Sequence, residues 1–366
     1  MNTFFLDRLN SEPHALAFAG QSTPWPVALA DQSANPALDE ALHTHAAAAQ
    51  ALLYPVSAEL LATTGRPVDL FGFEPNPARL GAAAAASASV PGIALTQLGA
   101  LLDAAALGYN PAQAKPVAVL GHSQGVLAVH MVQAICEAGS IDAAAAKIDE
   151  ILAIATLIGV AGTRQARQLG LAARHGEATP MLSVKDITRA QVDALIERVD
   201  GARGPIAVAV TNSATHYVLS GYPEDLAAFG VKVAKEHKRQ AKLREEKVRG
   251  GRVFDPTLEY LDVTLPFHSP LMADAVSQAV AWAEACDINA DHARELAAEV
   301  LLNHVDWAAR VRALMKSTDP SALWVLDFGP GNTVGKLFST VAQGTGVGVV
   351  EASTVADRGA LSTLET

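Results

Sequence analysis

The sequence is poor in cysteine and has no long unbroken apolar runs. Its two cysteines, Cys136 and Cys286, lie far apart in the chain. Two thiols are too few for a disulfide framework or a thiolate zinc site, which favours a reduced, cytoplasmic setting. No apolar run reaches the ~18 uninterrupted residues that a membrane-spanning helix requires. Residues 1–16 lack the basic and apolar regions of a signal peptide. We therefore expect no association with a membrane.

Positive charge is also scarce. The chain has 27 Lys and Arg against 38 Asp and Glu, a net charge of −11, and only 18% of its residues are charged. This acidic balance disfavours nucleic acid as a partner. Half of the 366 residues are apolar, which is enough for a large core. A chain of this length is expected to form two domains, or one large domain with an inserted subdomain.

Strand-like and helical segments alternate along the chain. Short apolar runs at 15–19, 116–120 and 323–328 read as strands, separated by segments with helical spacing, one of them expected to begin at Pro91-Gly92. Such alternation predicts an α/β fold with a hydrolase-like parallel-sheet core. From about residue 180 the order becomes β-α-β-β-α-β, which is typical of a ferredoxin-like α+β subdomain. We therefore predict a core of residues 1–179 and 267–366, with the subdomain inserted as residues 180–266.

A candidate nucleophile lies between a predicted strand and a predicted helix. Residues 121–125 read Gly-His-Ser-Gln-Gly, after the strand 116–120 and before a breaker-free helical run at 126–137. A serine in this setting lies on a sharp turn, where the glycines allow close approach of neighbouring chain. The backbone N–H of the next residue, Gln124, is then suited to bind a developing oxyanion. This context predicts Ser123 as a nucleophile.

A serine nucleophile requires a base, and His268 is the preferred candidate. It follows a predicted strand within residues 266–270, Pro-Phe-His-Ser-Pro, so prolines hold it at the end of an element. Histidines in helical segments, such as His130, are interpreted as packing or surface residues. A serine hydrolase remains an alternative, with Asp255 or Asp262 completing a triad in the order that such enzymes show.

Several ordered motifs resemble the acyltransferase domains of fatty acid and polyketide synthases, a malonyl/acetyl transacylase superfamily. The matching segments are FAGQ at 18–21, GHSQG at 121–125, TNS at 211–213 with VLSG at 218–221, FHSPLM at 267–272, and DFGPG at 327–331. The similarity spans residues 16 to about 340. Gln124 after the serine makes the chain most similar to the acetyltransferase domain of bacterial type I fatty acid synthases.

The resemblance implies an acyl-serine mechanism and a set of site residues. Ser123 would be the nucleophile and His268 the base, with the backbone N–H groups of Gln21 and Gln124 as the oxyanion hole. Asn212 and His122 would lie at the substrate. A main-chain carbonyl would orient the histidine, and the best-aligned position is Val300. Ser22 stands where the family has glycine, and His304 stands where it often has proline.

The resemblance also implies the substrates and partners. We expect transfer of an acyl group from a coenzyme A thioester to the phosphopantetheine arm of an acyl carrier protein, alongside other fatty acid synthase domains. No bound cofactor or metal is expected.

The acyl group is predicted to be acetyl or another short neutral one. Malonyl-specific relatives carry an arginine on the helix behind the nucleophile, where it would pair bidentately with the malonyl carboxylate. Here that position aligns with Ile158, which offers no counter-ion. The alternative is a local misalignment, with Arg164 or Arg167 pairing with malonyl. Transfer of a longer acyl group is a further alternative.

A basic stretch runs from Lys232 to Arg252 and contains nine Lys and Arg. Such a stretch usually forms a solvated helix face. The alternative is a docking surface for an acidic carrier protein or for the phosphates of coenzyme A.

Overall fold

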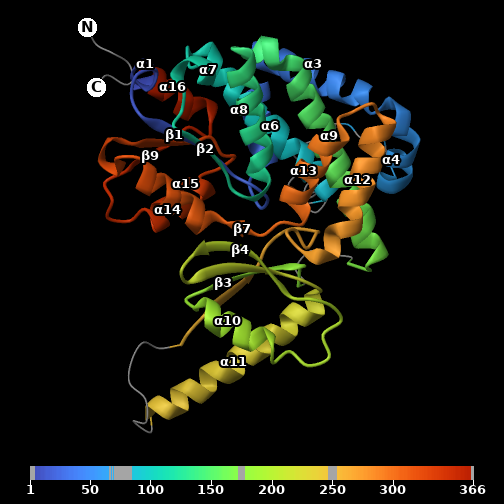
Figure 1. Cartoon of the computed structure of the whole chain (residues 1–366), viewed down its shortest axis with the longest axis vertical. Coiled ribbons are helices and arrows are strands. Elements are labelled where there is room, and N and C mark those ends of the chain that lie inside the picture. Colours follow the sequence, from blue (N-terminus) through green and yellow to red (C-terminus); the bar gives the residue numbers. More distant parts are fainter. Residues whose placement is uncertain are drawn as a thin grey trace.

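The computed structural model describes residues 5–65, 67, 69, 85–171, 178–245 and 254–363. Two sheets organise the described chain (Figure 1). The helices are α1 Phe5–Leu9, α2 Trp25–Ser33, α3 Pro36–Leu52, α4 Ser57–Thr64, α6 Ala86–Ala106, α7 Pro111–Ala114, α8 Val126–Ala138, α9 Ile141–Gln168, α10 Arg189–Ile196, α11 Pro223–Glu245, α12 Ala273–Ala285, α13 Ala290–Leu301, α14 Trp307–Ser317, α15 Thr333–Val341 and α16 Val355–Thr363.

The first sheet has four strands in the order β2-β1-β8-β9, and all of its pairs are parallel. The strands are β1 His14–Phe18, β2 Ala118–Gly121, β8 Trp324–Asp327 and β9 Gly348–Glu351. Phe18 at the end of β1 pairs with Gly121 at the end of β2. The loops that follow these strands therefore leave the same edge of the sheet, where ligands of parallel sheets bind. The predicted α/β core is confirmed.

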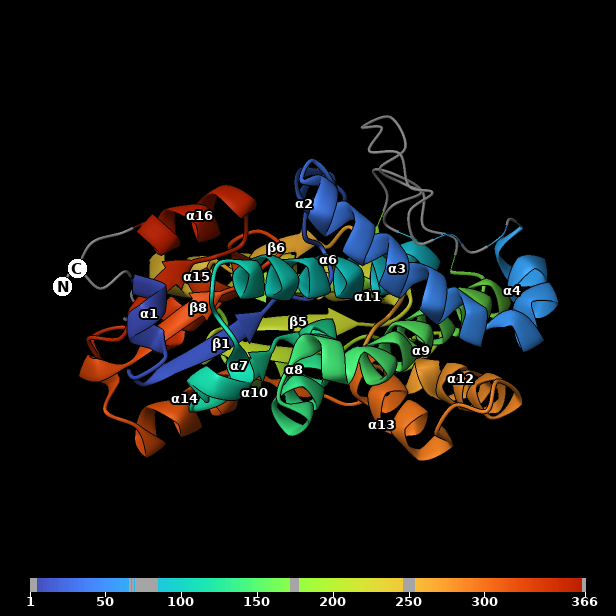
Figure 2. The ribbon, with the colours of Figure 1, turned by 90° about the horizontal axis from the view of Figure 1, so that it is seen from above.

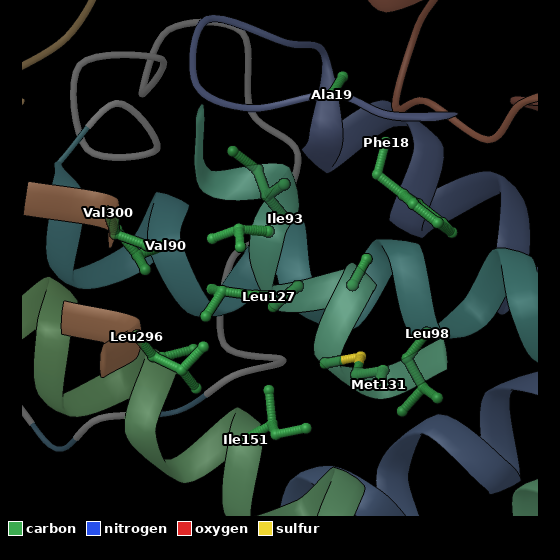
Figure 3. Close-up of a cluster of buried hydrophobic side chains, with 14 of the residues drawn as sticks. Phe18, Ala19, Val90, Ile93, Leu98, Leu127, Met131, Ile151, Leu296 and Val300 are labelled. Carbon is green, nitrogen blue, oxygen red and sulfur yellow. The ribbon is translucent and has the colours of Figure 1, made fainter. Parts of the chain in front are cut away.

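Helices surround this sheet (Figures 1 and 2). Most of the buried side chains of the main core come from these helices. The central helix is α6, the one helix of the described chain that is long and apolar enough to cross a membrane. In this fold it is a core helix, with 89% of its most apolar stretch buried. Figure 3 shows side chains of α6, α8, α9 and α13 converging with Phe18 of β1. The predicted start of this helix at Pro91-Gly92 is wrong, because burial holds five earlier residues, from Ala86 on, in the helix despite the missing N–H of Pro91.

The second sheet has the order β6-β3-β5-β4-β7. Its strands are β3 Met181–Lys185, β4 Ala207–Ser213, β5 His216–Ser220, β6 Thr257–Tyr260 and β7 Val305–Asp306. The first four strands are antiparallel neighbours, and with α10 and α11 they follow the β-α-β-β-α-β order of the predicted ferredoxin-like unit. The short strand β7 comes from outside residues 180–266 and pairs in parallel with β4.

The two faces of the second sheet have different partners. Tyr217 and Leu219 of β5 point into a small core that they share with α10 and α11, whereas Val218 between them belongs to the main core. This alternation is the period of two expected of a strand. Ser183 lies directly opposite Val218, so it shares the face toward the main core. His216, two residues before Val218 on β5, lies on that same face.

Candidate active site

The predicted nucleophile lies on a tight turn between β2 and α8. Ser123 begins a short 3₁₀ turn, Ser123–Gly125, and has a φ of 55°. Few non-glycine residues adopt this left-handed conformation, and those that do are concentrated at functional sites. A Cβ on Gly125 would lie 2.3 Å from the carbonyl oxygen of Phe18. Only glycine therefore lets the start of α8 pack against the end of β1.

His268 meets this serine from a remote part of the chain. The Ser123 hydroxyl lies 2.6 Å from His268 Nε2, a distance at which it donates a hydrogen bond. His268 precedes the 3₁₀ turn Pro270–Met272, has a φ of 57°, and is only 2% exposed. Two residues that are 145 positions apart are thus held in direct contact.

The other ring nitrogen of His268 faces a backbone carbonyl. Nδ1 lies 2.8 Å from the oxygen of Asn303 and donates to it. This bond fixes the proton on Nδ1 and leaves Nε2 free to accept the serine proton. A carboxylate would occupy this place in the hydrolase alternative. Asp255 instead lies beside His237, with 3.4 Å between Nδ1 and Oδ1.

The prediction of Val300 as the orienting carbonyl is wrong. Val300 lies in the last turn of α13, and its side chain is buried in the main core (Figure 3). The carbonyl of Leu301, the last helical residue, accepts from the N–H of Ser269. Asn303 follows the end of the helix, so its carbonyl is not directed along the helix axis and reaches the imidazole.

Burial keeps His268 neutral. Loss of solvent is the largest cause that lowers its pKa, to about 3, and the nearby His122, His304 and Arg310 lower it further. The hydrogen bond to Asn303 acts in the opposite direction. A neutral imidazole at ordinary pH is the form that can take a proton.

The loop after β1 passes directly over the nucleophile. A Cβ on Gly20 would lie 2.9 Å from Ser123 Cβ and 3.2 Å from the backbone nitrogen of Gln124. Gly20 is thus in contact with the serine turn, and Gln21 comes directly after it. The backbone N–H groups of Gln21 and Gln124 therefore lie on adjoining segments. The next residue, Ser22, has a φ of 63°, which explains why glycine would suit this position.

A chain of polar side chains links the nucleophile turn to the second sheet. His122 Nε2 lies 2.8 Å from Asn212 Oδ1, and the Asn212 amide nitrogen lies 3.4 Å from His216 Nε2. Ser183 Oγ lies 3.0 Å from the same nitrogen of His216. Burial lowers the pKa of His122 and lowers that of His216 to about 4. Both rings are therefore neutral hydrogen-bonding groups. Together they hold the side chain of Asn212 next to the nucleophile turn.

Ile158 is fully buried on α9. The arginines named in the alternative alignment have other partners. Arg164 lies over Trp282 and donates to Gln278 Oε1 at 2.9 Å, and Arg167 donates to the carbonyl of Thr63.

Several residues around the turn had no signal in the sequence. Arg310 of α14 donates to the carbonyl of Gly121 at 2.9 Å, and Gln97 of α6 donates to the carbonyl of Ala19 at 2.7 Å. Both are single side chains that reach backbone atoms distant in sequence, so no local pattern could indicate them. Among the residues that the structure describes, no three or more His, Cys, Asp and Glu side chains are grouped so as to hold a metal ion.

The basic stretch occupies the end of α11. In the described part, Lys232 pairs with Asp200 at 2.9 Å and Arg239 pairs with Glu236 at 2.6 Å. Residues 246–253 of the stretch lie outside the described residues. Because α11 packs on the face of the second sheet away from the main core (Figure 1), it lies on the far side from Asn212 and Ser123. A docking role for this stretch stays a prediction.

Comparison with known proteins supports the motif resemblance. Residues 180–260 match the family model described as "Fatty acid synthase central AT domain". The chain is 26% identical over 302 residues to fatty acid synthase subunit beta of Saccharomyces cerevisiae, and 25% identical over 265 residues to fatty acid synthase beta subunit hexB of Dothistroma septosporum. These alignments cover 73% and 64% of this chain but only 14% of each relative.

Solved structures share the fold. A malonyl-CoA–acyl carrier protein transacylase from Coxiella burnetii matches with a TM-score of 0.62 and 16% identity, covering 97% of this chain and 98% of the other. The corresponding protein from Mycobacterium tuberculosis, described as MCAT, matches with a TM-score of 0.63 and 19% identity, covering 95% and 99%. A third match is a malonyl transacylase bound to an acyl carrier protein, with a TM-score of 0.60, 17% identity, and coverage of 96% and 99%. The predicted similarity to acyltransferase domains of fatty acid synthases is confirmed. The solved structures show that this chain shares the fold of the transacylases.

Proposed function

We propose that this chain transfers a short neutral acyl group, acetyl above all, from coenzyme A to the phosphopantetheine thiol of an acyl carrier protein in fatty acid synthesis. The observation that carries the proposal is the 2.6 Å contact between Ser123 and a histidine whose other nitrogen is held by a backbone carbonyl. The motif order and the fatty acid synthase relatives support the carrier protein as acceptor. We place the reaction in the cytoplasm, beside other fatty acid synthase domains.

The first half-reaction acylates the serine. As His268 Nε2 takes the hydroxyl proton, Ser123 Oγ attacks the thioester carbonyl. The oxyanion that forms is bound by the N–H groups of Gln21 and Gln124, at the positive end of the helical segment that begins at the nucleophile turn. Collapse of the intermediate breaks the carbon–sulfur bond, and the protonated His268 returns its proton to the leaving thiolate.

The second half-reaction reverses these roles. The carrier thiol gives its proton to His268 and attacks the acyl-serine carbonyl, and the same two N–H groups bind the oxyanion. Ser123 leaves and recovers its proton from the imidazolium. A carbonyl partner leaves His268 without the fixed negative charge of a Ser-His-Asp triad. The imidazolium is therefore less stabilised here than beside a carboxylate.

The proposal of acetyl rests on position 158 and on the two arginines of the alternative alignment. Ile158 is buried and apolar, and Arg164 and Arg167 are turned to other partners. A malonyl carboxylate buried without a partner would cost about 3 kcal/mol, enough to disfavour it by about a hundredfold. Acetyl carries no such charge.

The test is a transfer assay with a holo carrier protein as acceptor. We expect acetyl-coenzyme A to be used with thiol transfer much faster than release to water, and Ser123→Ala and His268→Ala to abolish transfer. Hydrolysis as fast as transfer would favour the hydrolase alternative, and preference for malonyl would overturn the assignment of the acyl group.

A further inference from the structure

The side chain of Gln124 bridges the two segments that carry the proposed oxyanion donors. Its Oε1 accepts a hydrogen bond from Gln21 Nε2, and its Nε2 donates to the carbonyl of Val90 on α6 at 2.6 Å. The residue is fully buried. Both polar ends of its amide therefore have hydrogen-bond partners within the protein.

Hydrogen bonds hold the loop that carries Gln21 at several points. Gln97 donates to the carbonyl of Ala19 at 2.7 Å, and Thr23 Oγ1 donates to the carbonyl of Gly20 at 3.0 Å. The bond to Gln124 acts on Gln21 itself, the residue whose own N–H must point at the oxyanion. Because an oxyanion donor must lie within about 2.7–3.1 Å of the developing charge, a small displacement of Gln21 removes it from use.

The bridge also fixes the loop to a rigid element. Val90 lies on α6, the central buried helix of the main core, whereas Gln21 lies on a partly exposed loop. The Gln124 side chain bonds to the helix at one end and to the loop at the other. The backbone N–H of Gln124 is the second proposed oxyanion donor. One residue thus carries one of the two N–H groups and contacts the loop that carries the other.

We propose that the Gln124 side chain is a positioning residue that holds the Gln21 N–H in the oxyanion hole. This inference rests on the proposed acyl-serine function. An apolar side chain at 124 would keep the backbone donor and lose the bridge.

Gln124→Leu is the direct test, because it keeps the backbone N–H and much of the side-chain volume. Removal of one oxyanion donor typically costs about 10²–10³ in rate, and a donor that is loosened rather than removed should cost less. We expect the rate constant of serine acylation by acetyl-coenzyme A to fall about 10- to 100-fold, with KM changed less than about threefold. A loss confined to KM, or a wild-type rate, would overturn the proposal.

Gln32→Leu is the matched control. Gln32 of α2 is also buried, at 1% exposure, and its Nε2 donates to a carbonyl of the same helix, that of Thr96, at 2.9 Å. This variant removes one hydrogen bond from an amide to an α6 carbonyl, away from Ser123, whereas Gln124→Leu removes such a bond and the bond to Gln21 as well. We expect Gln32→Leu to lower thermal stability no more than Gln124→Leu does, because Gln32 Oε1 has no hydrogen-bond partner among the described residues, and to leave the acylation rate unchanged. Equal rate losses in both variants would assign the effect to general destabilisation.

A double-mutant cycle tests the bridge itself. Gln21→Ala removes the other end of the bond and also retains its backbone N–H. If the two side chains act only through one another, the double variant should be no slower than the slower single variant, within about threefold. If the rate losses of the two single variants multiply in the double variant, the bridge is contradicted.

Failure of the bridge and failure of the proposed function give different results. If Ser123→Ala still accepts radioactive acetyl groups, the acyl-serine mechanism itself is wrong. If labelling depends on Ser123 but Gln124→Leu acylates at the wild-type rate, only the positioning role is wrong.

Discussion

The low pKa of His268 predicts an unusual pH dependence of acylation. Burial lowers this pKa to about 3, from an ordinary value of 6.5. At pH 5 a histidine with a pKa of 6.5 would be only about 3% neutral, whereas one with a pKa of 3 would be about 99% neutral. The base of the proposed mechanism is thus available far into the acid range.

The assay is the rate constant for acylation of Ser123 in single-turnover experiments between pH 8 and pH 5. We expect it to fall less than about twofold over this range if the base stays neutral, against about thirtyfold for an ordinary histidine. Circular dichroism at each pH confirms that the protein stays folded. A half-maximal rate near pH 6.5 would refute the reasoning.

The same shift has a consequence for folding. The folded state keeps His268 neutral, whereas the unfolded state binds a proton below about pH 6.5. The stability associated with this group is therefore fully present above pH 6.5 and is lost as the pH falls toward 3, by up to about 1.4 kcal/mol per pH unit. His268→Gln should flatten this decline in urea unfolding, and an unchanged slope in that variant would contradict the assigned pKa.

Three other experiments concern the buried core, the nucleophile turn and the acyl group. Asp103→Ala should lower the free energy of unfolding by about 3–5 kcal/mol, because it leaves Arg358 buried without the carboxylate that lies 2.6 Å from its Nε; a loss below about 1 kcal/mol in urea unfolding would count against this. Gly125→Ala should slow acylation about a hundredfold or more, since its Cβ would clash with the Phe18 carbonyl and displace Ser123; a wild-type rate would show that the turn can shift freely. The ratio of kcat/KM for acetyl- over malonyl-coenzyme A should be about a hundred or more, and a ratio below one would show that a counter-ion other than a residue at position 158 is present.

Much of the fold could be predicted because its signals are local. The strand, turn and helix around Ser123 follow from apolar runs and glycines within residues 116–137, and the structure places β2, the turn and α8 there. The β-α-β-β-α-β order from residue 180 likewise follows from short-range pattern. The exceptions are long-range effects. Burial extends α6 through Pro91, and β7 is a two-residue strand that forms only because β4 lies beside it.

The site residues also fall into those with a local sequence signal and those without one. Ser123 and His268 were predicted from their motifs, and the structure brings them together. The orienting carbonyl was misplaced by three residues, because a carbonyl has no side-chain signature and its direction depends on where α13 ends. The bonds of Gln124, Gln97 and Arg310 to their partners join segments that meet only in the folded chain, so their roles required coordinates.

The most direct test of the account is the site of covalent acetylation. The protein is mixed briefly with acetyl-coenzyme A, quenched in acid and digested, and the modified peptide is sequenced by mass spectrometry. We predict one acetyl group, as an ester on Ser123, that disappears when a holo carrier protein is added before quenching. An acetyl group on another residue, or none on Ser123 while transfer to the carrier proceeds, would contradict the acyl-serine mechanism.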